Sequence, residues 1–209
     1  MTRSDIEPRR SRRTEKKAPS DRRVQLLEIA ASLFATNGYS QTTVRDIADE
    51  AGILSGSLYH HFDSKEAMLD EILRDFLGRL YERFQAIESS GVDPRQMLDE
   101  LIEHSFSTIH DTPHAVALYQ NESGVIGRQP GFEYVIETSK QIEAVWLRTL
   151  QAGQAAGVFR KDLDTSLTYR FIRDTVWAAV RWYRPGGRFK QETVAEQYLN
   201  MLHGGLLSN

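Results

Sequence analysis

The chain has 209 residues, of which 40% are hydrophobic and 26% are charged, with a formal net charge of −3 and no cysteine. These values are typical of a globular protein, and the lack of cysteine excludes disulfides and thiolate metal sites. We find no apolar stretch long enough to span a bilayer and no signal sequence, so we expect a cytoplasmic protein without membrane contact.

The beginning of the chain is strongly basic. Residues 1–23 hold nine Arg and Lys against four Asp and Glu, a charge of +5, so the remaining residues carry −8. Residues 1–19 show no apolar periodicity and predict a disordered basic arm. Such an arm can be merely solvated, or it can follow the phosphate backbone of DNA or enter its minor groove. Its position just before the helices described next favours the contact with DNA.

A first helix is predicted from Ser20 to the residue before Gly38. Ser20 is a capping residue, Asp21 suits the positive end of the helix dipole, and glycine is the commonest helix terminator. The apolar residues of this helix recur at helical spacing, namely Leu26, Ala30, Leu33 and Phe34. We expect this stripe to pack beneath the two short helices that follow.

Residues 40–66 predict two short helices that meet at a tight turn. The first, over 43–51, brings its apolar residues onto one side, and Gly52 stands where a left-handed residue lets the chain reverse. Ser55 is the expected cap of the second helix, over 56–62. This is the arrangement by which a helix is presented to the major groove of DNA.

The outward residues of the second helix distinguish it from an ordinary helical hairpin, which normally carries Glu and Lys on its solvated face. Here they are small or hydrogen-bonding, namely Ser55, Gly56, Ser57, Tyr59 and His60. Glycine early in a helix costs about 1 kcal/mol relative to alanine, so Gly56 indicates that a partner approaches the backbone closely.

Contacts to phosphate are expected next to this surface. Thr43 lies at the amino end of its helix, where its hydroxyl and the backbone N–H groups can hold an anion. Arg45 can add to this contact, although an exposed arginine is more often only solvated. Tyr59 and His60 are better placed for phosphate or base edges.

The same stretch resembles the amino-terminal domain of the TetR family of transcriptional repressors. The matching positions are Gly38-Tyr39, Thr42-Thr43-Val44, Ile47-Ala48, Ala51-Gly52, Gly56-Ser57-Leu58-Tyr59, His61-Phe62 and Ser64-Lys65-Glu66. The resemblance implies that Lys65 grips the DNA backbone. Leu54 departs from the family pattern, which has a small or polar residue and then a basic one before the glycine, so the usual basic contact is in doubt.

The family implies an all-α, TetR-like fold in two domains. Residues 20–64 would form the three-helix DNA-binding domain with its helix-turn-helix, and residues 65–209 a larger helical domain for effector binding and dimerisation. The implied partners are double-stranded operator DNA, a second copy of the chain and a small-molecule effector.

Beyond residue 64 the sequence predicts six further helices, separated by glycine and proline. They cover 65–89, 94–111, 113–123, 133–156, 164–184 and 190–204. No stretch alternates with period two, so we expect no sheet. The helix 65–89 is expected to connect the two domains as a rod and to carry any signal between them.

One stripe in the second domain combines tryptophan and arginine. Tyr169, Arg173, Trp177 and Arg181 recur at i, i+4 spacing, which predicts one helix face. In a pocket wall, tryptophan would pack against an apolar ligand and arginine would meet anionic groups. The alternative is that Arg173 pairs with a core or cross-dimer carboxylate, with Arg170–Asp174 as an obvious local pair.

Residues 43–62, 118–120 and 169–187 are similar to one branch of the family, the KstR-type repressors of steroid breakdown in cholesterol-degrading actinobacteria. They most resemble the branch member that controls degradation of the last two rings. The resemblance implies an effector that releases DNA, the coenzyme A thioester of a bicyclic propanoate intermediate. Trp177 would then pack on the fused rings or the pantetheine and Arg181 would pair with a coenzyme A phosphate, with Arg173 and Tyr119 as secondary contacts.

The last two helices are the expected dimer face, by family resemblance and by their aromatic and leucine residues, namely Trp182, Tyr183, Tyr198, Leu199 and Leu202. Two other functions stay open, a TetR-type repressor of fatty acyl-CoA metabolism or drug efflux, and an acyl-CoA-binding protein or enzyme. Catalysis has little support, because the chain lacks a nucleophile elbow, a GxxxxGK loop and an HExxH pair. No cofactor or metal site is expected, since Pro113 separates His110 from His114.

Overall fold

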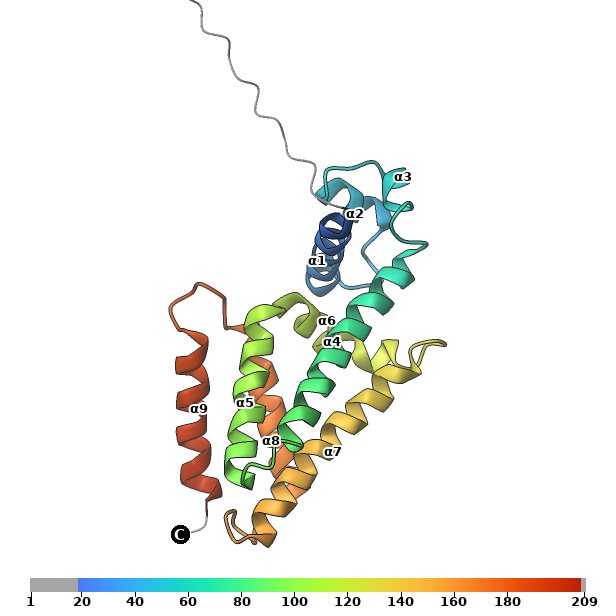
Figure 1. Cartoon of the computed structure of the whole chain (residues 1–209). Coiled ribbons are helices and arrows are strands. Elements are labelled where there is room, and N and C mark those ends of the chain that lie inside the picture. The colour runs from blue at the N-terminus through green and yellow to red at the C-terminus, as the bar shows by residue number, and fades with distance from the viewer. Residues whose placement is uncertain (1–18, 208–209) are drawn as a thin grey trace, which may run out of the picture.

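The computed structural model describes residues 19–207, and within them the chain forms helices and no strand (Figure 1). The helices are α1 (Pro19–Asn37), α2 (Val44–Glu50), α3 (Ser55–Leu58), α4 (Lys65–Glu88), α5 (Pro94–Asp111), α6 (Pro113–Ile126), α7 (Glu133–Ala155), α8 (Thr165–Ala178), a short 3-10 helix (Ala179–Arg181) and α9 (Gln191–Leu206). The expected all-α architecture is confirmed. The predicted basic arm lies outside the described residues, apart from Pro19, where α1 begins one residue before the expected cap.

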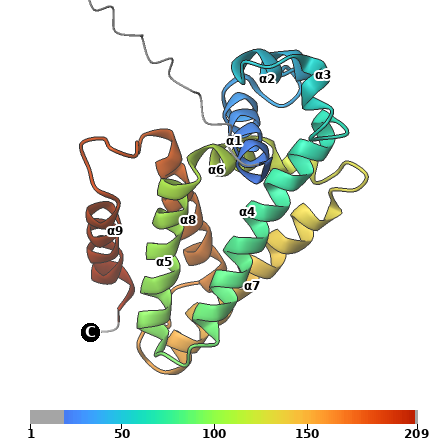
Figure 2. The same ribbon diagram turned by 45° about the horizontal axis from the view of Figure 1, so that its top comes forward.

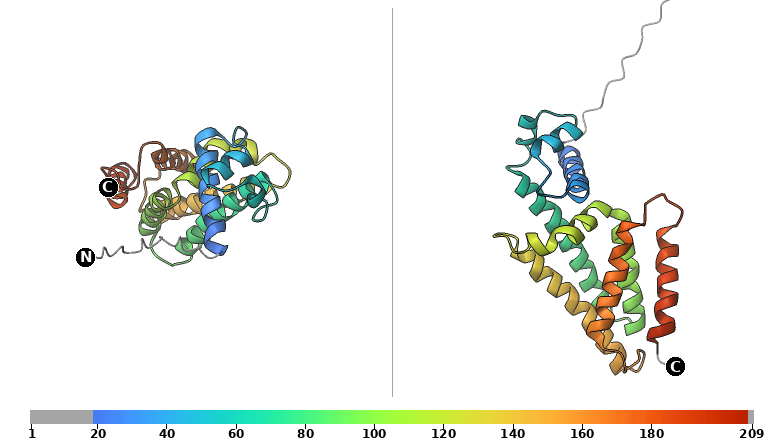
Figure 3. Two further views of the ribbon diagram at one scale, coloured as in Figure 1. Left: turned by 90° about the horizontal axis from the view of Figure 1, so that it is seen from above. Right: turned by 180° about the vertical axis from the view of Figure 1, so that it is seen from behind.

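Helices α1 to α3 form a small domain at one end of the molecule, and α4 runs from it into a bundle with α5, α7, α8 and α9 (Figures 1 and 2). Seen from behind, α9 lies at the outer edge of this bundle beside α5 (Figure 3). The predicted helix bounds agree closely with the observed ones for α4 to α7 and for α9. The predicted helix 164–184 is wrong at its end, because α8 stops at Ala178 and the chain tightens into a 3-10 turn.

The predicted stripe on α4 is buried along its whole length. Its members are Met68, Ile72, Phe76, Leu80 and Phe84. The aromatic ring at the lower end, Phe84, meets Trp146 of α7 edge to face, with 5.6 Å between ring centroids. Because this core continues into the small domain through Leu26, Phe34 and Leu58, the two domains share one hydrophobic core.

The small domain also packs against α6, which the sequence did not suggest. Helix α1 packs more extensively on α6 than on α4, and the backbone N–H of Tyr39 donates to Glu122 Oε1 of α6 at 3.3 Å. Helix α4 connects the two domains as expected, but it is not their sole contact. The small domain has two attachments to the bundle, and a signal between the domains need not pass through α4.

Two of the nine basic residues counted near the amino terminus are used inside the small domain. Arg22 Nη2 donates to the carbonyl of Ala51 at 2.8 Å and so caps the end of α2. Arg23 donates to the carbonyl of His61 at 2.8 Å, pairs with Glu71 and lies 4.1 Å from the centre of the Phe62 ring.

Lys65, the first residue of α4, closes the same domain from the other side. Its ammonium group donates to the carbonyl oxygens of Tyr39 and Thr42, both at 2.9 Å, and lies 4.3 Å from the centre of the Tyr39 ring. The loop between α1 and α2 is thereby fixed to the start of α4.

Several apolar side chains are exposed along α8 and α9. Leu167 and Phe171 of α8 are 54% and 70% exposed, and Met201 of α9 is 74% exposed. A groove of about 530 Å³ lies between these helices. Of the dimer-face residues predicted from sequence, Trp182 is exposed and Tyr198 and Leu202 are half-buried. Tyr183 and Leu199 lie in the chain's own core, so the predicted face is wrong at these two positions.

Across residues 19–207, no helix combines the length and the apolar character that crossing a membrane requires.

Replacing Lys65 with methionine keeps the length of the side chain but removes the donor of two hydrogen bonds inside the small domain. We expect Lys65→Met to lower the free energy of unfolding by about 2 kcal/mol, because hydrogen bonds from a charged donor are lost and two carbonyls are left unpaired. Urea unfolding followed by circular dichroism measures this. Lys140→Met, at an exposed lysine of α7, is the matched control. Equal unfolding midpoints for the two variants would contradict the structural role of Lys65.

Candidate nucleic-acid interface and effector site

Helix α3, which the sequence predicts to enter the major groove, is shorter than expected. α3 has four residues, and the chain then continues as turns in which His61 N and Phe62 N donate to the carbonyl of Leu58 at 2.9 and 3.1 Å. The cap is Leu54, without a side-chain hydrogen bond, so the prediction that Ser55 caps a helix over 56–62 is wrong. Glycine, serine, tyrosine and histidine all have lower helix propensity than alanine, so the residues around α3 do not favour a longer helix.

The inward and outward faces of this segment are as predicted. Leu58 and Phe62 are buried, whereas Gly56, Tyr59 and His60 are exposed and Ser55 and Ser57 are half-buried. Gly52 adopts a φ of +64°, which confirms the left-handed turn between α2 and α3. Figure 2 shows α2 and α3 at the end of the molecule that faces away from the bundle.

Leu54 is 80% exposed at the start of α3 and is a candidate contact that sequence reasoning missed. The sequence marked it only as a departure from the family pattern. An exposed apolar side chain next to a reading helix can meet the methyl group of thymine, which lies in the major groove. The signal was present in the sequence, because leucine is unusual at an exposed helix cap.

Thr43 is held in a reciprocal cap with Asp46. Asp46 N donates to the Thr43 hydroxyl at 3.2 Å, and Asp46 Oδ2 accepts from both Thr43 N and the Thr43 hydroxyl at 2.8 Å. These hydrogen bonds hold the pKa of the Asp46 carboxyl below its usual range. The donors that the sequence assigned to phosphate already serve a carboxylate, so a phosphate contact of Thr43 stays a prediction that requires Asp46 to move.

The side chain of Arg45, another predicted phosphate contact, reaches into solvent. It pairs with Asp49 at 3.6 Å, and both side chains are exposed, so the pair leaves the guanidinium available. Lys65 uses two of its three donors inside the domain. Its grip on the DNA backbone stays a prediction.

Two of the residues assigned to the effector, Arg173 and Tyr119, lie on α8 and α6. Arg173 is half-buried on α8, bonds Asp174 Oδ1 at 2.8 Å and lies 5.6 Å from the centre of the Tyr169 ring. The hydroxyl of Tyr119, on α6, lies 2.6 Å from Ser139 Oγ of α7. Burial raises the pKa of Tyr119, and the nearby charge of Arg173 opposes this shift. The predicted Arg170–Asp174 pair is wrong, because Asp174 pairs with Arg173 instead.

Arg181, the last residue of the predicted stripe on α8, does not lie on the same helix face as the others. Trp177 is buried at the end of α8, but Arg181 ends the 3-10 turn and is exposed. A 3-10 turn advances about 120° per residue rather than about 100°, so Arg181 no longer continues the i, i+4 row. The prediction of one continuous face from Tyr169 to Arg181 is wrong beyond Trp177.

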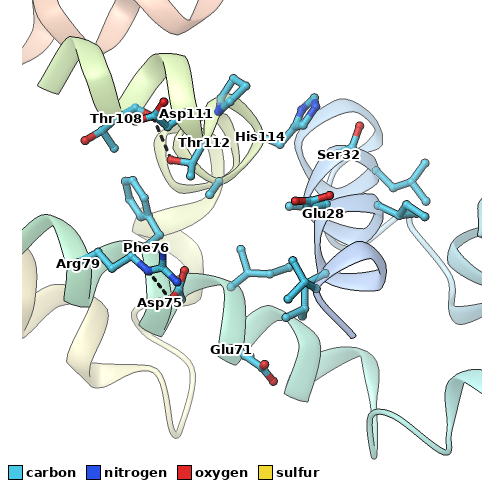
Figure 4. Close-up of a pocket in the computed structure, with 18 of the residues that line it drawn as sticks. Glu28, Ser32, Glu71, Asp75, Phe76, Arg79, Thr108, Asp111, Thr112 and His114 are labelled. Atoms are coloured by element: carbon cyan, nitrogen blue, oxygen red, sulfur yellow. Dashed lines mark hydrogen bonds and ion pairs between the residues drawn. The ribbon is translucent and has the colours of Figure 1, made fainter. Parts of the chain in front are cut away.

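A second cavity, larger than the groove between α8 and α9, lies elsewhere. A cleft of about 1020 Å³ lies between α1, α4 and the junction of α5 with α6 (Figure 4). Its apolar wall includes Phe76, and its rim carries five carboxylates, from Glu28, Glu50, Glu71, Asp75 and Asp111. In Figure 4, Asp75 is paired with Arg79, at 2.7 Å. None of the four predicted effector residues lines this cleft. The carboxylates of the cleft would repel the negatively charged phosphates of coenzyme A.

Within the described part of the chain, no group of three or more His, Asp or Glu residues could hold a metal ion.

Both halves of the chain match known families of bacterial regulators. Residues 26–72 match "Bacterial regulatory proteins, tetR family", and residues 91–206 match "Tetracyclin repressor-like, C-terminal domain". The chain belongs to the TetR family. Like other members of this family it is a DNA-binding transcriptional regulator, and the two matched segments contain the helix-turn-helix and most of the helical bundle.

Similar TetR-family proteins cover nearly the whole chain. The HTH-type transcriptional repressor KstR2 of Rhodococcus jostii (strain RHA1) is 51% identical over 189 residues, which are 90% of this chain and 93% of that protein. The solved structure of the ketosteroid transcriptional regulator KstR2 of Mycobacterium tuberculosis is 48% identical and has a TM-score of 0.88, covering 94% of this chain and 100% of that one. AibR, solved with isovaleryl coenzyme A and operator DNA, is 19% identical with a TM-score of 0.74, covers 88% of this chain and 99% of that chain, and shares the fold.

Tyr59 tests the reading surface directly, because it is 54% exposed at the end of α3. We expect Tyr59→Ala to weaken operator binding about tenfold, the effect of losing one groove or phosphate contact, and to leave effector affinity unchanged. Fluorescence anisotropy with DNA recovered by in vitro selection on the purified protein measures this. Val125→Ala, at an exposed apolar residue of α6, is the control. Wild-type operator affinity of Tyr59→Ala would remove this residue from the interface.

Proposed function

We propose that this TetR-family protein represses genes of steroid degradation and leaves its operator when it binds an acyl coenzyme A thioester. The observation that carries the proposal is the identity of about 50% with two KstR2 repressors over 90% of the chain. The similarity extends through both the helix-turn-helix of α2 and α3, called the reading unit below, and the helical bundle. One similar solved structure is that of a ketosteroid transcriptional regulator, which points to steroid-related genes.

The proposed reading mode is a dimer on a palindromic site. Two copies of α3 would enter successive major grooves about 34–36 Å apart, the spacing of one DNA turn. The exposed residues of α3 and its flanks, including Gly56 and Leu54, favour close apolar and backbone approach over charge. Phosphate attraction would then come from Arg45 and from the basic residues before α1.

The dimer would form through α8 and α9. Their exposed apolar residues, Leu167, Phe171 and Met201, border one groove. Exposed apolar residues that lie together in this way are uncommon on a surface that stays in water. A second copy of the chain covering this face would remove them from solvent.

The effector would act by changing the packing around α8. The chemistry of the residues suits a coenzyme A thioester, since Trp177 offers an apolar ring and Arg173 and Arg181 offer cations for phosphate. Trp177 is only 8% exposed, so a ligand can reach its ring only when neighbouring side chains move. A ligand that binds the moved state better will shift the protein toward it, and this differential affinity is what release from DNA requires. The solved complex of AibR supports the proposal at the level of fold, since it holds an acyl coenzyme A and operator DNA.

The proposal is tested by titrating the protein–operator complex in a mobility-shift assay. Three compounds are compared, a bicyclic steroid-derived propanoate, free coenzyme A and the thioester of the two. Release by the thioester alone supports the proposal. Release by a fatty acyl coenzyme A instead would assign the protein to fatty-acid metabolism, and no release by any thioester would exclude acyl coenzyme A as the effector.

Arg181→Ala should bind operator as the wild type does but require at least about tenfold more thioester for release, the loss expected for one charge-assisted phosphate contact. Arg170→Ala, at an exposed arginine of α8, is the matched control. A release curve that coincides with that of the wild type would show that Arg181 does not contact the effector.

Phe171→Asp should convert the dimer to a monomer, because it places a charge in the centre of the proposed apolar face. Light scattering after size-exclusion chromatography measures the mass, and circular dichroism checks that the helices persist. Val125→Asp makes the same change at an exposed site on α6 that is 65% exposed and should stay dimeric. A dimeric Phe171→Asp would place the interface elsewhere.

A further inference from the structure

The end of α1 depends on an acceptor from the other domain. Gly38 has a φ of +87°, and its N–H closes the helix on the carbonyl of Phe34 at 3.1 Å. The next N–H, that of Tyr39, points out of this turn and, within residues 19–207, donates only to Glu122 Oε1 of α6. Tyr39 is 8% exposed, and an unpaired N–H at such a site would be costly.

The turn that Glu122 contacts, at Gly38 and Tyr39, leads into α2 and is hydrogen-bonded to the beginning of α4. The hydroxyl of Tyr39 donates to Glu66 Oε1 at 3.0 Å, and its carbonyl accepts from Lys65, so this single residue contacts the beginning of α4 twice. Burial and the neighbouring Glu66 raise the pKa of the Tyr39 hydroxyl, which therefore remains a donor at neutral pH. Thr42 closes the loop by donating to the carbonyl of Gly38 at 2.9 Å, immediately before α2 begins.

We propose that Glu122 is a positioning residue for operator reading, which holds the Tyr39 turn and through it fixes α2 and α3. The proposal concerns DNA binding alone and does not depend on the identity of the effector.

The proposal is tested without effector. Glu122→Ala removes the acceptor, whereas Glu122→Gln keeps an oxygen at the same place, and Gln120→Ala changes an exposed residue of the same helix. We expect Glu122→Ala to bind selected operator DNA at least about fivefold more weakly, the effect of one lost charge-assisted hydrogen bond, with Glu122→Gln and Gln120→Ala within about twofold of the wild type. Amide hydrogen exchange over residues 38–43 should speed up in Glu122→Ala only, while circular dichroism shows that the helices persist. Wild-type operator affinity and exchange in Glu122→Ala would overturn the positioning role.

Discussion

The contact of Lys65 with the carbonyl oxygens of Tyr39 and Thr42 is the interaction on which the position of the reading unit depends. It joins the loop between α1 and α2 to the first residue of α4, so three helices meet at one ammonium group. A charged donor between two carbonyls is stronger and more directional than apolar packing alone. The orientation of α2 and α3 relative to α4 is therefore held where the DNA-binding domain meets the bundle.

This use of cations inside the domain explains the character of the reading surface. Arg22 and Arg23, which belong to the basic beginning of the sequence, hold the end of α2 and the turn after α3. The exposed surface of α3 is left with small, aromatic and apolar groups. Under the proposed reading mode, affinity for the phosphate backbone and recognition of bases would be divided between different parts of the chain, and only the first would depend strongly on salt.

The candidate effector residues differ from the surface of α3 in that most of them are buried or half-buried in the bundle rather than exposed. Trp177 is buried, Tyr119 is hydrogen-bonded to Ser139, and the large cleft between the domains is lined by carboxylates that disfavour an anionic ligand. A packed site beside α6 and α8 is suited to a switch, since a ligand that binds there must move the helices that surround it. Helix α6 carries one of these candidate residues, Tyr119, and also packs on α1.

The sequence by itself determined the helical class, most helix bounds and the inward and outward faces of α2 and α3. These follow from local causes, namely apolar spacing, glycine at φ values above zero such as Gly38 and Gly52, and proline at the start of α5 and α6. It also identified the family, because the motif from Gly38 to Glu66 is contiguous. The tertiary structure alone decided the hydrogen bonds of Arg22, Lys65 and Glu122, the exposure of Arg181 and the burial of Tyr183. Each of these depends on a hydrogen bond or packing contact between residues far apart in the chain, or on where a helix tightens against its neighbours, and no local pattern specifies such contacts.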